Sequence, residues 1–157
     1  MRAKKPSESF TLMTEMVLPN DTNTLGNLMG GRLLHWMDIA AAIAAGRHCN
    51  RVVVTASVDS VDFTAAIKLG EVVSIEARVT RAFRTSVEVR LDVFSENMME
   101  GKRRRCNSAY YTFVAVDQNG RPIPVDPIEP ETPEERELYE GALRRRDQRL
   151  TTAKEKA

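Results

Sequence analysis

One apolar segment dominates the hydropathy pattern of the chain. Between Gly30-Gly31 and Gly46 the sequence RLLHWMDIAAAIAA contains neither proline nor glycine and is rich in Leu, Met and Ala, which favour helix. We therefore predict one helix of about four turns. Its apolar side chains occupy nearly every side, and a helix of that kind must be enclosed by other elements.

Segments with strand character lie on both sides of this helix. Residues 8–18 alternate imperfectly and predict an opening strand, followed by a loop up to Gly26. After the helix, β-branched and aromatic residues predict four strands, over residues 51–63, 71–81, 84–95 and 103–116. Because no βαβ alternation occurs, we predict an α+β domain in which a long, curved antiparallel sheet wraps the helix.

The C-terminal segment has a different pattern. Four prolines between residues 122 and 130 predict an extended linker, and Thr132-Pro133-Glu134-Glu135 has the residues of a capping box. We predict a surface helix from there to about Leu150, and a polar tail that frays. The chain is thus divided into a domain over residues 8–128 and a C-terminal helix and tail over residues 129–157.

Composition narrows the classes of function. The 157 residues are 42% apolar and 29% charged, which suits one globular domain with a core. Lys and Arg total 23 against 22 Asp and Glu, so no net field attracts nucleic acid or a membrane. No segment has the length of a membrane span, and no apolar core of a secretory signal follows the basic start, so we expect a cytoplasmic protein.

Metal and triad chemistry are poorly supported by the residues. Cys49 and Cys106 lie far apart, and only two histidines could join them, so we expect no metal site, no cofactor and no disulfide framework. The GxSxG, HExxH and P-loop motifs are absent from the sequence.

Asp38 is the strongest chemical anomaly, because an ionisable side chain within an apolar helix loses hydration unless something pairs with it. One interpretation is a narrow exposed stripe shared with His35 or Arg32. The other is a general base or nucleophile in a sheltered site. A His35–Asp38 dyad on one helix face is less common than a surface pair.

The segment before the helix holds further candidates. Gly30 and Gly31 either form a plain turn or present free N–H groups at a helix N-terminus to the oxyanion of an acyl transfer. Asn23 and Asn27 are loop residues by default, although an amide also holds a water molecule without titrating. The basic residues 103–105 either grip phosphates or form a charged sheet edge.

The chain resembles the hotdog-fold acyl-CoA thioesterases, in particular their cytosolic acyl-CoA hydrolase branch. Three separated motifs carry the resemblance in the family's order and spacing: PNDTNTLGNLMGGRLLHWMD, RVVVTASVDSVDF and NSAYYTFVAVDQNGRPIPV. The resemblance implies a hotdog fold, a homodimer with two continuous sheets, and a hexamer built as a trimer of dimers. It also implies hydrolysis of fatty acyl-CoA to free fatty acid and CoA.

The resemblance also assigns roles by position. Asp38 matches the family's catalytic carboxylate, Asn23 its polar partner, and Gly30 the helix-start glycine whose N–H polarises the thioester carbonyl. Asp38 either attacks the thioester or deprotonates a water molecule, and both routes stay open. The candidates for substrate binding are Gly31, Asn27, Thr55, Ser57, Arg84 and Ser86, the last two as contacts of CoA phosphate or pantetheine groups.

Helix geometry constrains how these residues meet. Eight helical residues between Gly30 and Asp38 rise about 12 Å, too far for both to touch one carbonyl carbon. We therefore expect Gly30 and Asn23 of one subunit to act with Asp38 of its partner, so that acyl-CoA binds between two copies of the chain. The alternative is a non-catalytic hotdog regulator that binds acyl-CoA or a nucleotide in the same groove. Asp38 and Asn23 together favour the enzyme.

Overall fold

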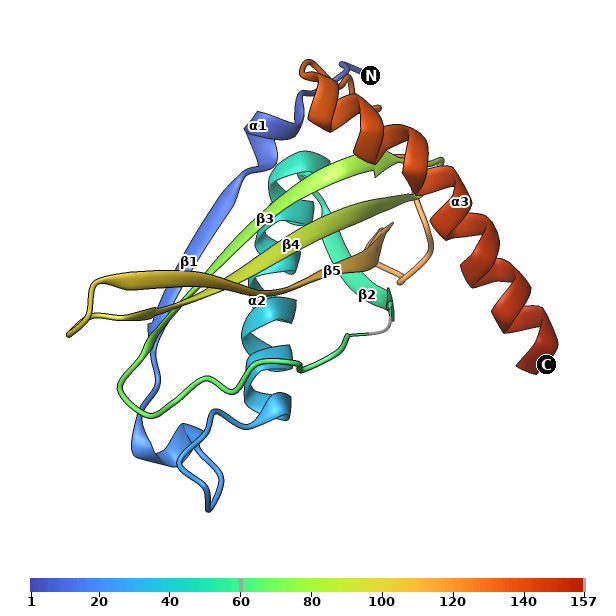
Figure 1. Cartoon of the computed structure of the whole chain (residues 1–157). Helices are drawn as coiled ribbons and strands as arrows, with labels where there is room; N and C mark the ends of the chain where they lie inside the picture. Colours follow the sequence, from blue (N-terminus) through green and yellow to red (C-terminus); the bar gives the residue numbers. More distant parts are fainter. Residues whose placement is uncertain (60, 157) are drawn as a thin grey trace.

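The structure, a computed structural model, describes residues 1–59 and 61–156. Ser60, which falls in the predicted strand 51–63, and Ala157, at the end of the predicted tail, lie outside the described residues. An antiparallel five-stranded sheet in the order β1-β3-β4-β5-β2 curls around one central helix, and a second long helix lies at its other face (Figure 1). The predicted α+β architecture is confirmed.

The bounds of the elements show where the predictions were right. In chain order the elements are α1 (Pro6–Ser9), β1 (Thr11–Met16), η1 (Pro19–Asp21), α2 (Gly30–Cys49), β2 (Val52–Val58), β3 (Val72–Ala82), β4 (Ser86–Asn97), β5 (Lys102–Val116) and α3 (Pro133–Lys156). The opening strand is shorter than predicted, because Pro6 and the Glu8 carboxylate, which accepts the Lys5 N–H, form the helical turn α1. The strand predicted over residues 51–63 ends at Val58.

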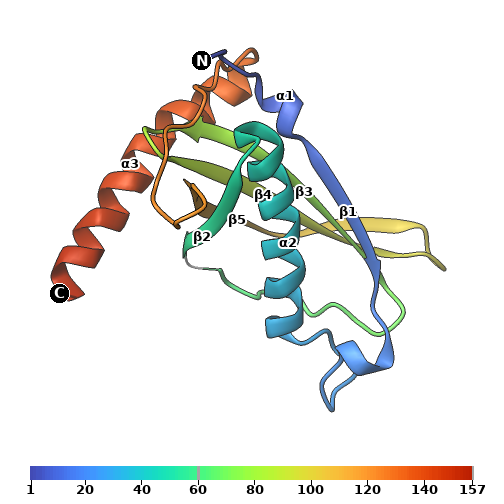
Figure 2. The ribbon, with the colours of Figure 1, turned by 180° about the vertical axis from the view of Figure 1, so that it is seen from behind.

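Helix α2 lies across the concave face of the sheet (Figure 2). Its small side chains let the sheet approach closely, and Met37 and four alanines are fully buried: Ala40, Ala41, Ala44 and Ala45. The helix continues past Gly46 and ends where Asn50 adopts the left-handed conformation, with φ 52°. Ile39 and Ile43 stay exposed, so this chain encloses α2 on part of its surface only.

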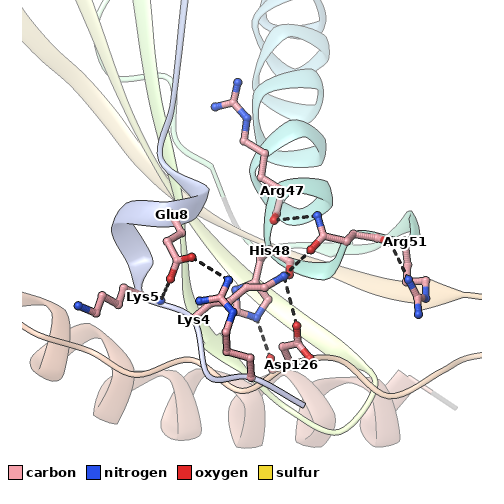
Figure 3. A network of polar contacts seen from close by, with 9 residues as sticks. Lys4, Lys5, Glu8, Arg47, His48, Arg51 and Asp126 are labelled. Carbon is pink, nitrogen blue, oxygen red and sulfur yellow. Dashed lines mark hydrogen bonds and ion pairs between the residues drawn. The ribbon is translucent and has the colours of Figure 1, made fainter.

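The C-terminal end of α2 is held by a polar cluster that joins three segments of the chain (Figure 3). Lys4, only 5% exposed, donates to the His48 carbonyl and, at 2.6 Å, to Asn50 Oδ1, and its Nζ lies 3.2 Å from Asp126 Oδ2. His48 Nε2 donates a hydrogen bond of 2.7 Å to the backbone carbonyl oxygen of Asp126. A cation at the carboxyl end of a helix interacts favourably with the helix dipole. The cluster therefore fixes the N-terminal segment and the proline-rich linker to α2.

Alternation along β5 assigns the two faces of the sheet. Tyr111 faces α2, because its hydroxyl donates to the Leu34 carbonyl. The neighbouring Tyr110 faces α3, where Cζ of Arg145 lies 3.9 Å from the centroid of the Tyr110 ring. On the α3 side the Arg145 guanidinium donates to both oxygens of the fully buried Glu88, at 2.9 and 2.8 Å. Helix α3 is therefore fastened to the convex face of the sheet.

Helix α3 begins at the predicted capping box and extends further than predicted. Glu135 N–H donates to Thr132 Oγ1 at 3.1 Å, and Thr132 N–H donates to Glu135 Oε1 at 3.2 Å, which is the predicted capping box. The predicted end at about Leu150 was wrong, because α3 continues to Lys156, and the fraying of the tail stays a prediction. The residues TTAKEK contain no helix breaker, and Ala, Lys and Glu favour helix without packing.

The β2 strand forms an open edge of the sheet. It pairs with β5 on one side, and three of its valines are exposed: Val52, Val54 and Val58. An apolar edge strand offers unpaired backbone groups to another strand.

Among the described residues no helix is long and apolar enough to cross a membrane.

Candidate functional site

Asp38, the predicted catalytic carboxylate, lies half-buried in the middle of α2, beside the edge strand β2. Thr55 Oγ1 donates a hydrogen bond of 2.8 Å to Asp38 Oδ1. Thr55 faces the helix because it pairs with Phe113, a residue of the core beneath α2. Its hydroxyl gives the carboxylate the polar partner that an apolar helix cannot supply. The structure thus brings two predicted site residues together from different elements.

The surface-stripe interpretation of Asp38 needs Arg32 or His35 as a neighbour. Arg32 Nε instead lies 3.2 Å from Asp21 Oδ1, in the segment before the helix. His35 is exposed, and across residues 1–59 and 61–156 no hydrogen bond or ion pair joins it to Asp38. The partner of Asp38 is therefore the threonine of β2, and the His35–Asp38 dyad does not form.

Tyr111 is a neighbour of Asp38 that the sequence analysis missed. Burial raises the pKa of its phenol to about 12, and the negative charge of Asp38 adds to the shift. Its hydroxyl donates at 3.4 Å to the carbonyl of Leu34, one helical turn before Asp38. Alternation within Ala109-Tyr110-Tyr111 is the signal that places one of the two tyrosines on the helix face.

The N-terminus of α2 holds backbone donors without acceptors. Met29, the N-cap, makes no side-chain capping bond, and in the part of the chain that the structure describes the amides of Gly30 and Gly31 donate to no acceptor. Partial positive charge gathers at this end of a helix. These two amides can therefore receive an oxyanion, as one of the two interpretations of the glycine pair requires.

Asn23 and Asn27 build the tight turn that leads to this helix end. Asn23 Oδ1 accepts the N–H groups of Leu25 at 2.9 Å and of Asn27 at 3.2 Å, and Asn23 N–H donates to the Asn27 carbonyl at 2.9 Å. The expected loop role of both residues is confirmed. Asn23 Oδ1 already accepts two hydrogen bonds within the turn. The Nδ2 amide of Asn23 is therefore the side-chain group left to hold a water molecule or substrate.

Ser57 is not brought to Asp38. The register between β2 and β5 shifts between Thr55 and Ser57, so that Thr55 pairs with Phe113 and Ser57 pairs with Thr112. Neighbouring residues of β5 point to opposite faces, so this bulge turns Ser57 away from α2. Its hydroxyl is buried and has no hydrogen-bond partner among the described residues. Strict alternation, which would align Ser57 with Thr55, fails here because of one extra residue.

Arg84 and Ser86 lie at the turn between β3 and β4, beside α3 (Figure 1). Phe83 N–H donates to the Ser86 carbonyl at 2.8 Å, and Val125 N–H donates to the Arg84 carbonyl at 3.0 Å. Outside Ser60 and Ala157, no hydrogen bond or ion pair links Arg84 or Ser86 to Asp38. Their contact with CoA phosphate or pantetheine groups stays a prediction.

The basic residues 103–105 are engaged within the sheet. Arg103 Nη2 lies 3.3 Å from Glu76 Oε2, Arg105 pairs with Asp92, and Arg104 Nε donates to Ser95 Oγ at 2.9 Å. The sheet-edge interpretation of this run accounts for these contacts.

Titratable and metal-ligating groups elsewhere add little to the site. Burial raises the pKa of the Cys49 thiol to about 11, so it stays protonated and is a poor nucleophile. Within residues 1–59 and 61–156 no group of three or more His, Cys, Asp or Glu side chains could hold a metal ion. A cavity of about 550 Å³ between β2 and α3 is lined by Asp59, Arg145 and Arg149 among others, and by no predicted site residue.

Comparisons with known proteins bear directly on this site. A family model, that of the thioesterase superfamily, matches residues 25–102. A curated relative, the uncharacterized acyl-CoA thioester hydrolase YkhA of Bacillus subtilis, is 43% identical over 142 residues, which are 90% of this chain and 83% of that protein. The crystal structure of an apo-hexameric acyl-CoA thioesterase matches with a TM-score of 0.93 and 42% identity, over 98% of each chain.

A second solved relative has been crystallised with ligands. It is an acyl-CoA hydrolase from Staphylococcus aureus in complex with butyryl coenzyme A, coenzyme A and coenzyme A disulfide, 35% identical, with a TM-score of 0.92 over 99% of this chain and 94% of that one. Three further structures of that hydrolase replace an asparagine, an aspartate and a threonine by alanine. In its numbering these are fifteen and then seventeen positions apart, the spacing of Asn23, Asp38 and Thr55 in this chain.

Proposed function

The chain belongs to the thioesterase superfamily, and from this premise we propose that it hydrolyses fatty acyl-CoA to free fatty acid and CoA at a site shared by two protomers. One observation carries the proposal. Asp38, held by Thr55, lies on the same helix as the amide of Gly30, which has no acceptor among the described residues, and the two are about 12 Å apart along the helix axis. A base and an oxyanion-binding group are what acyl transfer requires, and this spacing keeps them from meeting within one chain.

The chemistry of the site follows from these groups. In one route Asp38 takes a proton from water as the water oxygen bonds to the thioester carbon; the C–S bond then breaks, and the proton passes to the CoA thiolate. In the other route an Asp38 oxygen bonds to the thioester carbon, and the C–S bond breaks to release the CoA thiolate. Water then hydrolyses the mixed anhydride to fatty acid and the free Asp38 carboxylate, and the proton that it gives up passes to the thiolate. In both, the Gly30 and Gly31 amides hold the oxyanion, and Asn23 Nδ2 positions water.

Thr55 supports either role of Asp38. By donating to Oδ1 it fixes the orientation of the carboxylate and leaves Oδ2 for the reaction. The match in residue type and spacing with the three alanine variants of the Staphylococcus aureus hydrolase supports Asn23, Asp38 and Thr55 as one set. Asn27, Ser57, Arg84 and Ser86 stay predicted contacts of the substrate.

The open edge of the sheet supports a homodimer. Val58 of β2 pairs with Tyr111 and therefore shares the helix face with Thr55. Together with Ile39 and Ile43 of α2 it forms an exposed apolar border beside Asp38 and Thr55 that a second copy can cover. The hexameric relative supports a trimer of such dimers. A cytoplasmic location, with no nucleic acid or membrane as partner, belongs to the same proposal.

Hydrolysis by this mechanism needs water and no cofactor. Purified protein is expected to release free thiol from acyl-CoA at a rate that a chelator does not change. A panel of short, medium and long acyl-CoAs, assayed by thiol detection, separates the enzyme from the alternative. Binding of acyl-CoA without thiol release at any chain length would favour the non-catalytic regulator.

Subunit mixing tests the shared site. An Asp38→Asn protein and an Asn23→Ala protein, each inactive, are mixed under conditions that let subunits exchange. In the heterodimer both lesions fall into one of the two sites, and the other site has an intact Asn23 and an intact Asp38. Partial recovery of activity is expected, with exchange verified by mass spectrometry. If exchange occurs and no activity returns, both residues act within one subunit.

A further inference from the structure

Phe63 packs against Gly30, the first of the two glycines whose amides the mechanism assigns to the oxyanion. A Cβ on Gly30 would lie 3.3 Å from Phe63 Cε2, 3.5 Å from Cζ and 3.6 Å from Cδ2. Gly30 has helical backbone angles and no positive φ, so the backbone at this position would accept a residue with a side chain. Space in front of the Phe63 ring, and not backbone conformation, therefore explains glycine at position 30.

The contact is specific to this position of α2. A Cβ built on Gly31 or on Gly46, in the same helix, meets no atom within 4 Å. Alanine is a better helix former than glycine, so all three substitutions favour the helix itself. Only the one at Gly30 displaces a neighbouring ring.

The ring is placed to meet a substrate. Phe63 is 48% exposed although it is a large aromatic residue, and the exposed Met29 precedes the two free amides. Downstream of Phe63, Leu28 N–H donates to the Ile67 carbonyl at 2.7 Å, and Asn27 forms a bridge with Lys68, so this loop is tied to the segment that begins α2. A carbonyl bound at the amides would thus have an apolar wall beside it.

We propose that Phe63 is a substrate-contacting, specificity-determining residue: its ring forms the wall of the thioester site at the N-terminus of α2, and a side chain at position 30 would press on that ring. The ring packs against the acyl carbons next to the carbonyl and keeps water from the Gly30 amide. This inference rests on the proposed thioesterase function. It adds the residue that holds the acyl group against the oxyanion-binding amides.

A double-substitution experiment tests the inference. We expect Gly30→Ala to lower kcat/KM by about 10²-fold, because the new methyl moves the ring and displaces the thioester by a fraction of its reacting distance. Phe63→Leu raises KM severalfold and changes kcat less, since leucine keeps part of the apolar wall. Because leucine lacks the ring atoms nearest to Gly30, the double variant Gly30→Ala/Phe63→Leu should exceed Gly30→Ala alone in kcat/KM.

Matched controls come from the same helix. Gly46→Ala, outside the site, should keep wild-type kcat and KM. Gly31→Ala serves as the second control. Whatever its own effect on kcat/KM, the fold-change in the double variant Gly31→Ala/Phe63→Leu should equal the product of the two single fold-changes. Thermal unfolding of each variant separates loss of function from loss of fold. A double variant no better than Gly30→Ala, or an unchanged KM in Phe63→Leu, overturns the role of Phe63 while wild-type activity stands; an inactive wild type overturns the proposed function instead.

Discussion

The two ends of helix α2 are built in opposite ways. At the C-terminal end the carbonyl of His48 and the side chain of Asn50 receive the buried ammonium of Lys4, which also pairs with Asp126. At the N-terminal end the described residues supply no acceptor for the amides of Gly30 and Gly31, and no side chain caps them. One helix therefore has a C-terminal end at which Lys4 engages the acceptors, here called the saturated end although the buried His48 Nδ1 has no partner among the described residues, and an N-terminal end that is available to a ligand.

The physical reason for the difference lies in what unsatisfied groups cost. A buried charge such as Lys4 is tolerated only with partners, and three of them surround it. Free amides at a helix N-terminus lose stability that a cap would add, about 1 kcal/mol. The same amides, together with the helix dipole, attract negative charge. Stability is thus concentrated at one end of α2 and reactivity at the other.

The largest expected effect is on the catalytic half of the helix. Asp38→Asn should lower kcat by about 10²- to 10⁴-fold, because the amide neither accepts a proton nor attacks a thioester. Thermal unfolding should stay near that of the wild type, since the asparagine side chain keeps an oxygen that can accept from Thr55. Thiol release measures the rate, and Asp147→Asn, on the exposed surface of α3, is the control. A wild-type rate would return Asp38 to the surface-stripe interpretation.

The saturated end should respond in stability and not in rate. Lys4→Met removes the buried cation and is expected to lower the free energy of unfolding by about 2 to 3 kcal/mol. Lys5→Met, the neighbouring control, removes an exposed pair with Glu131 and should change the stability far less than Lys4→Met does. Urea denaturation measures both. Equal losses in the two variants would show that burial of Lys4 does not strengthen this end.

A smaller effect on rate is expected at Thr55. Thr55→Val removes the hydroxyl that Asp38 accepts while keeping the shape of the side chain. The loss of a hydrogen bond to a charged group predicts a fall in kcat of about tenfold or somewhat more. Thr55→Ser, which keeps the hydroxyl, should retain most of the rate. If serine and valine reduce kcat equally, packing and not the hydrogen bond supports Asp38.

The smallest expected effect is the part of the pH dependence of stability that comes from His48, at the saturated end of α2. Burial lowers the pKa of His48 below its ordinary value of 6.5; the Lys4 cation adds to this, and the hydrogen bond with the Asp126 carbonyl opposes it. The unfolded chain therefore binds a proton at a higher pH than the folded chain. Stability is complete above about pH 6.5 and declines as the pH falls below it, by at most about 1.4 kcal/mol per pH unit.

Urea midpoints at pH 7.5 and pH 5.5 check this sign. His48→Gln should show a flatter pH dependence than the wild type, because the titrating ring is gone. If the wild type lost no more stability than His48→Gln on acidification, burial would not be lowering the proton affinity of His48; the raised pKa of Asp59 acts in the opposite direction in both proteins.

Local and periodic patterns in the sequence determined much of this protein. An apolar helix around Asp38, strands before and after it, and the Thr132–Glu135 capping box follow from periodicity and from residues three positions apart. The roles of Asn23, Gly30 and Asp38 came from the family resemblance that three sequence motifs carry, and the rise of a helix alone separates Gly30 from Asp38. Apart from that resemblance, each of these inferences needs only neighbours along the chain.

Tertiary structure alone decided how distant segments meet. Thr55 became the partner of Asp38, Ser57 was turned to the other face by a bulge, Phe63 came to lie on Gly30, and Lys4 closed the far end of α2. None of these contacts has a period or a local spacing, because strand register and loop closure depend on the packing of the whole core. Composition and pattern specify which elements form; only packing specifies which side chains share a site.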